Sequence, residues 1–235
     1  MRKISVIFVL TLIFNLIGCD NKNPIQLEIS TLTDIDGNIY DTVKIGDQWW
    51  MAENLKVKKY RNGDHILNLS NASLWESNII GAYCSYGNFA STEGTYGLLY
   101  NWYAVADNRN IAPEGWHVPT DEDWKKLETY LGLEIDEING LNWRGDREGG
   151  KLKKEGTNYW IDPNKSANNE TGFTALPGGQ VFYTFDKIRY YGYFWTSSEN
   201  NDRFAWNRSL GYLYSSIHRE ATFKNKGLSV RLVKD

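Results

Sequence analysis

The sequence predicts an α+β domain built from short twisted antiparallel strands, one or two helices and long ordered loops. Three observations lead to this prediction. Short strand patterns joined by turn signals open the chain, a well-capped amphipathic helix pattern covers residues 121–131, and residues 144–179 are rich in Gly, Asn and Lys. The chain has 235 residues and no evident internal repeat, which suits one domain or two small ones.

Residues 1–18 have the pattern of a bacterial secretory signal peptide. A short cationic start precedes the almost wholly apolar residues 4–17, and Gly18 stands just before Cys19. The Leu-Ile-Gly-Cys ending resembles the lipobox of bacterial lipoproteins, which implies that Cys19 is lipidated and becomes the first residue of the mature chain. A plain signal peptide or a short membrane helix remains an alternative, although a spanning helix needs about 20 apolar residues and Asn15 interrupts this run.

The lipobox pattern leads us to expect a protein of the cell envelope, held by lipid in the outer membrane or at the cell surface. Residues 19–32 are predicted to form a lipidated tether, and residues 33–235 a single domain. The Asp-Ile-Asp-Gly-Asn sequence at 34–38 is a turn signal. Strands at 39–45 and 48–52, joined by a turn at Gly46, would complete a small β-meander.

A helix is predicted over residues 121–131. Thr120 is a favourable N-cap, and the three acidic residues that follow suit the positive end of the helix dipole. Apolar residues recur at i, i+3 and i+7, namely Trp124, Leu127 and Leu131. Gly132 provides the C-terminal stop, and a second helix is expected from about Glu134 to Gly140.

The C-terminal third reads as strands. Residues 180–185 and 188–194 are predicted to form a hairpin around Asp186 and Lys187. Three further strand candidates follow, at 204–210, 212–217 and 228–233.

Composition excludes some classes of function. The whole chain has 26 basic and 29 acidic residues; Arg2 and Lys3 would leave with the signal, giving the mature part a net charge of −5. No basic patch of the kind that nucleic-acid-binding proteins carry is visible. If Cys19 is lipidated, Cys84 has no partner for an intramolecular disulfide, and its aromatic neighbours suggest a small buried side chain.

Six segments resemble the Fibrobacter succinogenes major paralogous domain, a family of secreted and lipid-anchored bacterial proteins. They cover residues 45–55 (Ile-Gly-Asp-Gln-Trp-Trp-Met-Ala-Glu-Asn-Leu), 96–105, 112–124, 172–179, 193–199 and 227–233 (Gly-Leu-Ser-Val-Arg-Leu-Val). The family's pattern is similar to the C-type-lectin-like fold shared with formylglycine-generating enzymes. The resemblance therefore implies two small antiparallel sheets with flanking helices and long loops, without implying catalysis.

The sequence lacks most of the residues that the known reactions and metal sites of this fold require. Formylglycine-type oxidation uses two cysteines, whereas Cys84 stands alone. The three histidines, His65, His117 and His218, lack metal-ligand spacing. The oxygen-rich stretch 199–207 could suit calcium, but Arg208 stands where the lectin pattern has Asp, so we expect neither a metal nor a cofactor.

The abundance of aromatic residues is the remaining sign of a binding site. There are 10 Trp and 15 Tyr, and adjacent residues on a strand, such as Trp49 and Trp50, face opposite sides. Exposed rings suit the apolar C–H faces of sugars, and neighbouring Asn and Arg supply donors. The candidates are Trp49, Trp50, Tyr191, Trp195, Asn207, Arg208 and Tyr212.

These observations favour a non-catalytic module that binds a glycan or another protein at the cell envelope, attached to the membrane by its lipid. A structural part in a surface assembly is the first alternative. An enzyme on the same fold is the second, and it would show a concave pocket with convergent polar groups.

Overall fold

The computed structural model describes residues 27–235. Cys19, the predicted signal peptide and most of the predicted tether lie outside the described residues. Within the described part, no helix is long and apolar enough to cross a membrane.

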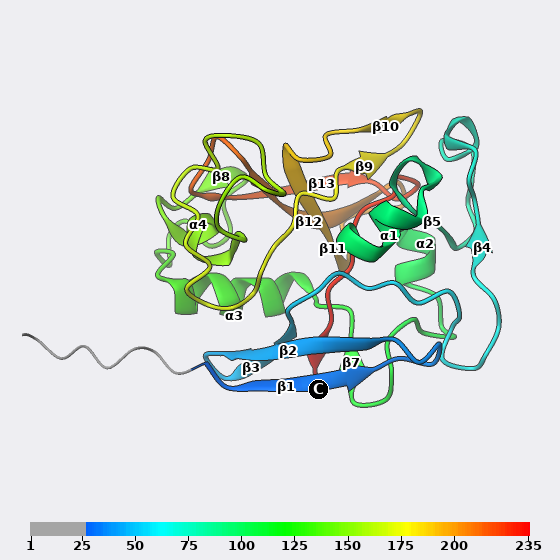
Figure 1. Cartoon of the computed structure of the whole chain (residues 1–235), viewed down its shortest axis with the longest axis horizontal. Coiled ribbons are helices and arrows are strands. Elements are labelled where there is room, and N and C mark those ends of the chain that lie inside the picture. Colours follow the sequence, from blue (N-terminus) through cyan, green and yellow to red (C-terminus); the bar gives the residue numbers. More distant parts are fainter. Residues whose placement is uncertain (1–26) are drawn as a thin grey trace, which may run out of the picture.

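A five-stranded sheet forms the lower layer of the molecule in Figure 1, with strand order β1-β2-β3-β14-β7. Its strands are β1 (Ile29–Thr33), β2 (Ile39–Ile45), β3 (Gln48–Met51), β7 (Trp116–His117) and β14 (Val233–Lys234). The predicted meander is confirmed, because β2 pairs antiparallel with β3 across the turn at Gly46. The ordered chain begins earlier than predicted, since residues 29–33 pair with β2 and are not tether.

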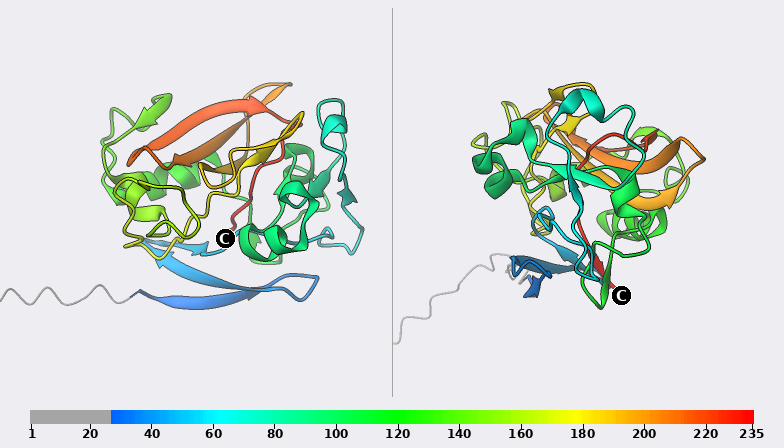
Figure 2. Two further views of the ribbon diagram at one scale, coloured as in Figure 1. Left: turned by 45° about the horizontal axis from the view of Figure 1, so that its top comes forward. Right: turned by 90° about the vertical axis from the view of Figure 1, so that its right-hand side faces the viewer.

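A four-stranded antiparallel sheet forms the upper layer, with order β11-β12-β13-β8. Its strands are β8 (Asn142–Arg144), β11 (Tyr191–Glu199), β12 (Phe204–Gly211) and β13 (Ile217–Phe223). The strand predicted at 204–210 is confirmed. The left view of Figure 2 shows this sheet and the five-stranded sheet on opposite sides of the molecule.

Two strand predictions in this region are wrong. Residues 212–216 form the reversal between β12 and β13 and are not a strand. The predicted 180–194 hairpin is replaced by two pairings, in which β9 (Gln180–Val181) pairs with β10 (Phe185–Asp186), and β11 pairs with β12. Of the strand predicted at 228–233, only its last residue belongs to a named strand, and residues 228 and 229 make isolated bridges.

Short elements between residues 67 and 105 close one end of the molecule. A three-stranded sheet has the order β4-β5-β6. The elements are β4 (Leu67–Asn68), η1 (Ala72–Leu74), β5 (Ala82–Cys84), η2 (Tyr86–Asn88), α1 (Ala90–Tyr96), β6 (Leu99–Tyr100) and α2 (Trp102–Val105), where η denotes a 3-10 helix.

The predicted helix is present as α3 (Asp121–Leu131). Thr120 and Asp123 form a reciprocal capping box, and Gly132 ends the helix in the left-handed conformation. The second helix expected at 134–140 is wrong: this stretch is a series of turns, and the following helix is α4 (Glu148–Leu152).

Helix α3 lies between the two sheets (Figures 1 and 2) and joins their cores. Its Trp124 is fully buried, with its ring centroid 5.2 Å from that of Trp50 on β3 and 5.9 Å from that of Phe194 on β11. Phe173, from the long loop, closes this aromatic core against Trp50 and Trp124. The four-stranded sheet therefore has an inner face on α3 and an outer face turned away from it.

Candidate functional site

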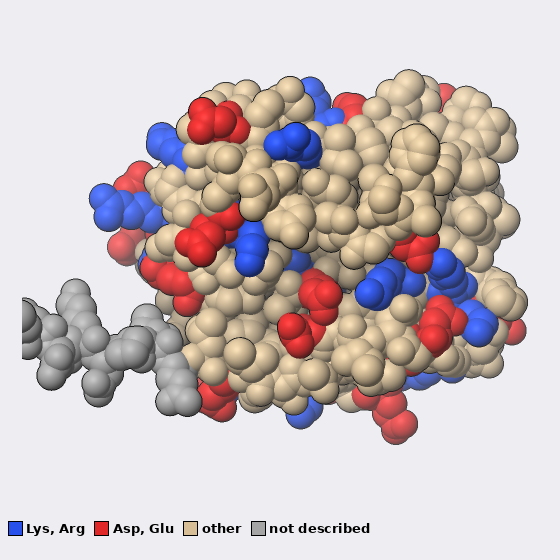
Figure 3. Space-filling model, in the orientation of Figure 1, with Lys and Arg blue, Asp and Glu red and all other residues tan. Residues whose placement is uncertain are grey.

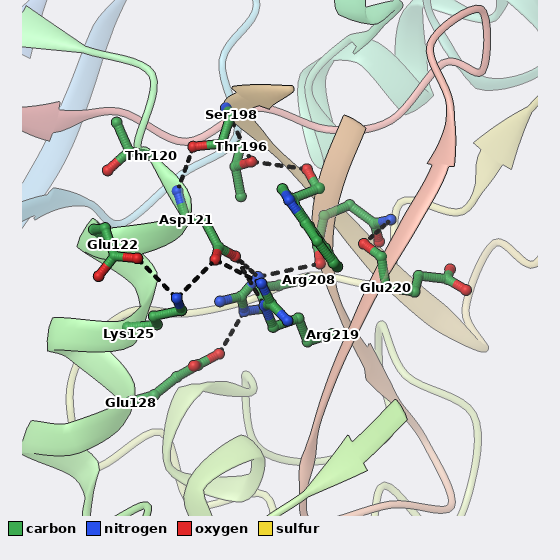
Figure 4. Close-up of polar contacts among 12 residues, drawn as sticks. Thr120, Asp121, Glu122, Lys125, Glu128, Thr196, Ser198, Arg208, Arg219 and Glu220 are labelled. Atoms are coloured by element: carbon green, nitrogen blue, oxygen red, sulfur yellow. Dashed lines mark hydrogen bonds and ion pairs between the residues drawn. The ribbon is translucent and has the colours of Figure 1, made fainter. Parts of the chain in front are cut away.

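The inner face of the four-stranded sheet carries a buried network of charged side chains. Figure 4 shows Asp121 and Glu128 projecting from α3 towards arginines of the sheet. Asp121 Oδ1 accepts from Arg208 Nη1 at 2.8 Å, and Asp121 Oδ2 accepts from Arg219 Nη2 at 2.8 Å. Glu128 Oε1 accepts from Arg208 Nε at 2.5 Å and from Arg144 Nη2 at 2.7 Å. The network thus joins α3 to β12, β13 and β8.

The electrostatics of this network favour the ionised form of Asp121. Burial by itself raises the pKa of Asp121, but the hydrogen bonds and charges of Arg219 and Arg208 outweigh it and hold that pKa well below its usual range. Asp121 is also approached by the Lys125 ammonium at 3.2 Å. Paired in this way, the carboxylates fix the sheet against the helix and give the opposite face of the sheet a rigid support.

The outer face carries a cluster of aromatic rings above Gly211. A Cβ built on Gly211 would lie 2.9 Å from the Tyr191 ring, 2.9 Å from the Tyr214 ring and 3.1 Å from the Trp143 ring. These three rings come from segments far apart in the sequence and converge because β12 offers no side chain beneath them. Trp143 and Tyr214 stack with their centroids 3.8 Å apart and an interplanar angle of 14°.

Two more rings extend this aromatic cluster. Tyr193 stacks beside Tyr191 with a centroid separation of 5.6 Å, and His218 lies edge-on to Trp143 at 4.9 Å. All five side chains are half-buried, so each contributes some surface to solvent. We define the aromatic cluster as Trp143, Tyr191, Tyr193, Tyr214 and His218.

His218 adds a polar group to the aromatic cluster. Its Nδ1 is buried and has no hydrogen-bond partner among the described residues. Burial lowers the pKa of His218, and the charge of Arg144 lowers it further against the opposing charge of Glu220. The lowered pKa favours the neutral form of the imidazole.

Comparison with known proteins identifies the family. The model of the Fibrobacter succinogenes major domain matches residues 43–234, which is most of the chain and includes both sheets apart from β1 and the start of β2. The chain belongs to this family. No curated protein and no solved structure shows a significant match.

In this member of the Fibrobacter succinogenes major domain family, four of the seven predicted ligand-binding residues have no exposed surface. They are Trp50, Trp195, Asn207 and Arg208. The two tryptophans pack in the cores, Asn207 donates to the Glu220 carbonyl at 3.1 Å, and Arg208 is held by α3. The expectation that these four side chains form an exposed binding face is corrected, because both faces of the strands are covered at these positions: Trp50 and Arg208 pack against α3, and Trp195, which pairs with Asn207, donates to the Tyr100 carbonyl at 2.7 Å.

The other three candidates keep partly exposed surface but do not form one site. Tyr191 lies in the aromatic cluster. Tyr212 packs edge-on against Tyr190, with the two ring centroids 5.3 Å apart. Trp49 lies on the five-stranded sheet, and it packs against a different core from Tyr212. Trp49 is half-buried against one core and Trp50 is fully buried in the other, so the two rings face opposite sides of β3 as predicted.

Sequence reasoning missed the other members of the cluster: Trp143, Tyr193, Tyr214 and His218. Trp143 lies at the edge of a stretch read as loop, and the pairing of Trp143 with His218 depends on the β8–β13 register. The alternation of residues 217–223 is the one signal that could have placed His218 on an outer face.

The oxygen-rich segment that we considered for calcium holds a lysine instead. Lys224 Nζ pairs with Glu199, donates to the Asp202 carbonyl at 3.1 Å, and lies 4.6 Å from the Trp102 ring centroid. The Asn201 side chain caps its own turn by accepting from the Arg203 N–H. Across residues 27–235 no group of three or more His, Cys, Asp or Glu side chains is placed to hold a metal ion.

Cys84 lies in a small core with Trp75, Leu99 and Val181 and has no exposed surface. Burial raises the pKa of its thiol well above the usual range. The side chain therefore stays a protonated, inaccessible thiol and packs as a small apolar group.

Proposed function

We propose that this protein is a non-catalytic carbohydrate-binding module of the cell envelope, with the aromatic cluster as its binding surface. The observation that carries the proposal is the convergence of three half-buried rings over Gly211. Sugars present apolar C–H faces, and the cluster offers complementary aromatic surface.

The arrangement of the sheet supports a preformed surface. Trp143 stands on β8, which Arg144 ties to α3 by a buried ion pair, and Tyr191 stands on β11, which pairs with β12, the strand that Arg208 ties to α3 in the same way. A ligand that contacts the rings would find them already ordered, and this reduces the entropy lost on binding.

The proposal of a non-catalytic role is supported by the chemistry of the described residues. Cys84 is buried and protonated, which makes it a poor nucleophile or redox centre. Near the aromatic cluster, the pKa of Tyr193 is raised by burial and by the charges of Asp186 and Glu220, so its hydroxyl remains a hydrogen-bonding group.

We also propose that the fold is C-type-lectin-like and that Cys19 carries the lipid anchor. The curled antiparallel sheets with few helices are compatible with the first proposal. The second rests on the lipobox pattern of residues 16–19. Labelling with an alkyne fatty acid tests it: Cys19→Ala is expected to abolish the label, and Cys84→Ser to retain it.

Binding to the aromatic cluster is tested with a glycan array and pull-down on insoluble plant, host and bacterial polysaccharides. Trp143→Ala and Tyr191→Ala are expected to weaken binding of any hit about tenfold or more, equivalent to ~1.4 kcal/mol or more. Tyr130→Ala is the matched control, because Tyr130 is a 63 % exposed aromatic residue on α3, away from the cluster. Absence of binding to every polysaccharide, or equal loss in the control, would contradict the proposal.

A further inference from the structure

A cavity opens on the face of the molecule shown in Figure 3, and none of its lining residues belongs to the aromatic cluster. Its volume is about 330 Å³, and it is enclosed by the segment after β3, by α1 and by two loops. The lining residues that matter for its chemistry are Glu53, Lys56, Glu93, Lys154 and Tyr159. Figure 3 shows acidic and basic side chains meeting across the middle of this face.

Several of the segments that carry the family resemblance meet at this cavity. Residues 52–54 belong to the first segment, Gly97 to the second, and Thr174 and Leu176 to the fourth. A Cβ on Gly97 would lie 2.8 Å from Asn54 Cβ, so the chains approach closely here. The cavity is therefore formed by the common framework of the domain.

Arg231, from the last of these segments, lies directly beneath the cavity. It is fully buried and donates to Asn54 Oδ1 at 2.7 Å and to the Thr174 carbonyl at 3.0 Å, and both of these residues line the cavity. Its partners are an amide and main-chain carbonyls, and it forms no ion pair with a described residue. Burial lowers the pKa of Arg231 to about 9, so its positive charge persists at pH 7.

The charges that line the cavity do not neutralise one another. Glu93 is already paired with Lys58 at 2.6 Å, and Glu53 accepts the Asp41 N–H at 2.8 Å. Lys56 and Lys154 form no ion pair with any residue of the described chain. The Glu93–Lys58 pair contributes no net charge. The remaining charged groups in and beneath the cavity are Lys56, Lys154 and Arg231 against Glu53, so their net charge is positive and favours an anionic ligand.

We propose that this cavity binds a small carboxylate-bearing molecule of about monosaccharide size, with Lys56 and Lys154 as the residues that hold the carboxylate. A cavity of this volume lies at the lower end of the range for small-molecule sites, about 300–1,000 Å³. Tyr159 and Thr95 add hydroxyl groups to the lining, which suits a ligand with further polar groups. An acidic sugar and an amino-acid carboxylate share this chemistry.

The test is isothermal titration of residues 20–235 at low ionic strength with three probes: D-glucuronate, N-acetyl-L-alanine and neutral D-glucose. We expect one or both carboxylates to bind and glucose not to bind. The carboxylate that binds identifies the source of the ligand. Lys56→Gln and Lys154→Gln are expected to weaken that binding at least tenfold, and Lys56→Arg and Lys154→Arg to restore most of it.

Two controls separate this site from the rest of the molecule. Lys126→Gln removes a lysine whose side chain is 70 % exposed on α3 and should leave binding unchanged. Trp143→Ala should also leave it unchanged, so failure of the aromatic cluster as a sugar site would not affect this result. Equal binding of glucose, no binding of either carboxylate, or unchanged binding in both Gln variants would overturn the proposal.

Discussion

Arg208 of β12 and Glu128 of α3 form an ion pair in which Nε and Oε1 are 2.5 Å apart and neither side chain is exposed. Arg144 of β8 shares the same carboxylate oxygen. One glutamate thus holds two strands of the four-stranded sheet to the helix, and the outer face of that sheet carries the aromatic cluster.

Replacing Glu128 with Gln should destabilise the fold by about 3–5 kcal/mol, because it leaves the Arg144 guanidinium buried without a counter-charge and Arg208 with Asp121 as its remaining carboxylate partner. Urea unfolding followed by tryptophan fluorescence measures the change. Glu122→Gln on the same helix is the control, since its side chain is 73 % exposed and the expected change is within about 0.5 kcal/mol. Similar losses in the two variants would contradict a special role for the buried pair.

Gly211→Ala should disturb the aromatic cluster. The added methyl group would lie within 3.1 Å of three rings, so they must separate, at a cost of about 1–3 kcal/mol. Near-UV circular dichroism should change, because the Trp143–Tyr214 stack contributes to it. Gly94→Ala is the matched control, since a Cβ there meets nothing within 4 Å; an unchanged spectrum for Gly211→Ala would show that the rings do not close over this position.

His117 should make the C-terminal strand sensitive to pH. Hydrogen bonding to Asp123 is the main cause that raises the pKa of His117, with a further contribution from Asp235 against the effect of burial. A raised folded-state pKa means that this stabilisation is fully present below about pH 6.5, the unfolded value, and is lost as pH rises through the higher folded pKa.

Hydrogen exchange of the Val233 amide from pH 5.5 to 8.5 measures this effect. Protection is expected to fall on the alkaline side after correction for intrinsic exchange, and His117→Asn should flatten the dependence. If the His117→Asn variant shows the same pH dependence as the unaltered protein, the hydrogen bonds of His117 with Asp123 and Asp235 are not its cause.

Cys84 should not react with Ellman's reagent in the folded protein and should react fully in 6 M guanidinium chloride. The reason is that the thiol has no exposed surface and a raised pKa. The measurement is absorbance on residues 20–235, in which Cys84 is the remaining cysteine. Stoichiometric labelling of the folded protein within minutes would show that the small core around Trp75 opens readily.

Local signals in the sequence predicted the local structure well. Thr120 and Gly132 mark the ends of α3 because capping depends on neighbouring residues alone. The turn at Gly46 and the opposite facing of Trp49 and Trp50 follow from the same local geometry. The 134–140 stretch failed as a helix because it has few residues that can bury an apolar face.

The candidate site depends on pairing between distant segments, which one sequence does not reveal. Trp143 meets Tyr214 and Tyr191 through the pairing of β8 with β13 and of β11 with β12, and Gly211 gave no sign of lying beneath them. Arg208 was taken for a surface donor because its partners, Asp121 and Glu128, are 80 or more residues away. The aromatic composition indicated that such a surface could exist, but not where it would form.

The position of β14 determines when the five-stranded sheet can be completed. Val233 pairs with Trp50 on one side and His117 on the other, so the last residues of the chain fill the middle of a sheet whose other strands are made first. Until those residues emerge, β3 and β7 cannot share a sheet, and the apolar surface beneath them stays unsealed. Closure of the five-stranded sheet therefore depends on residues 233 and 234, although β1, β2 and β3 pair with one another locally.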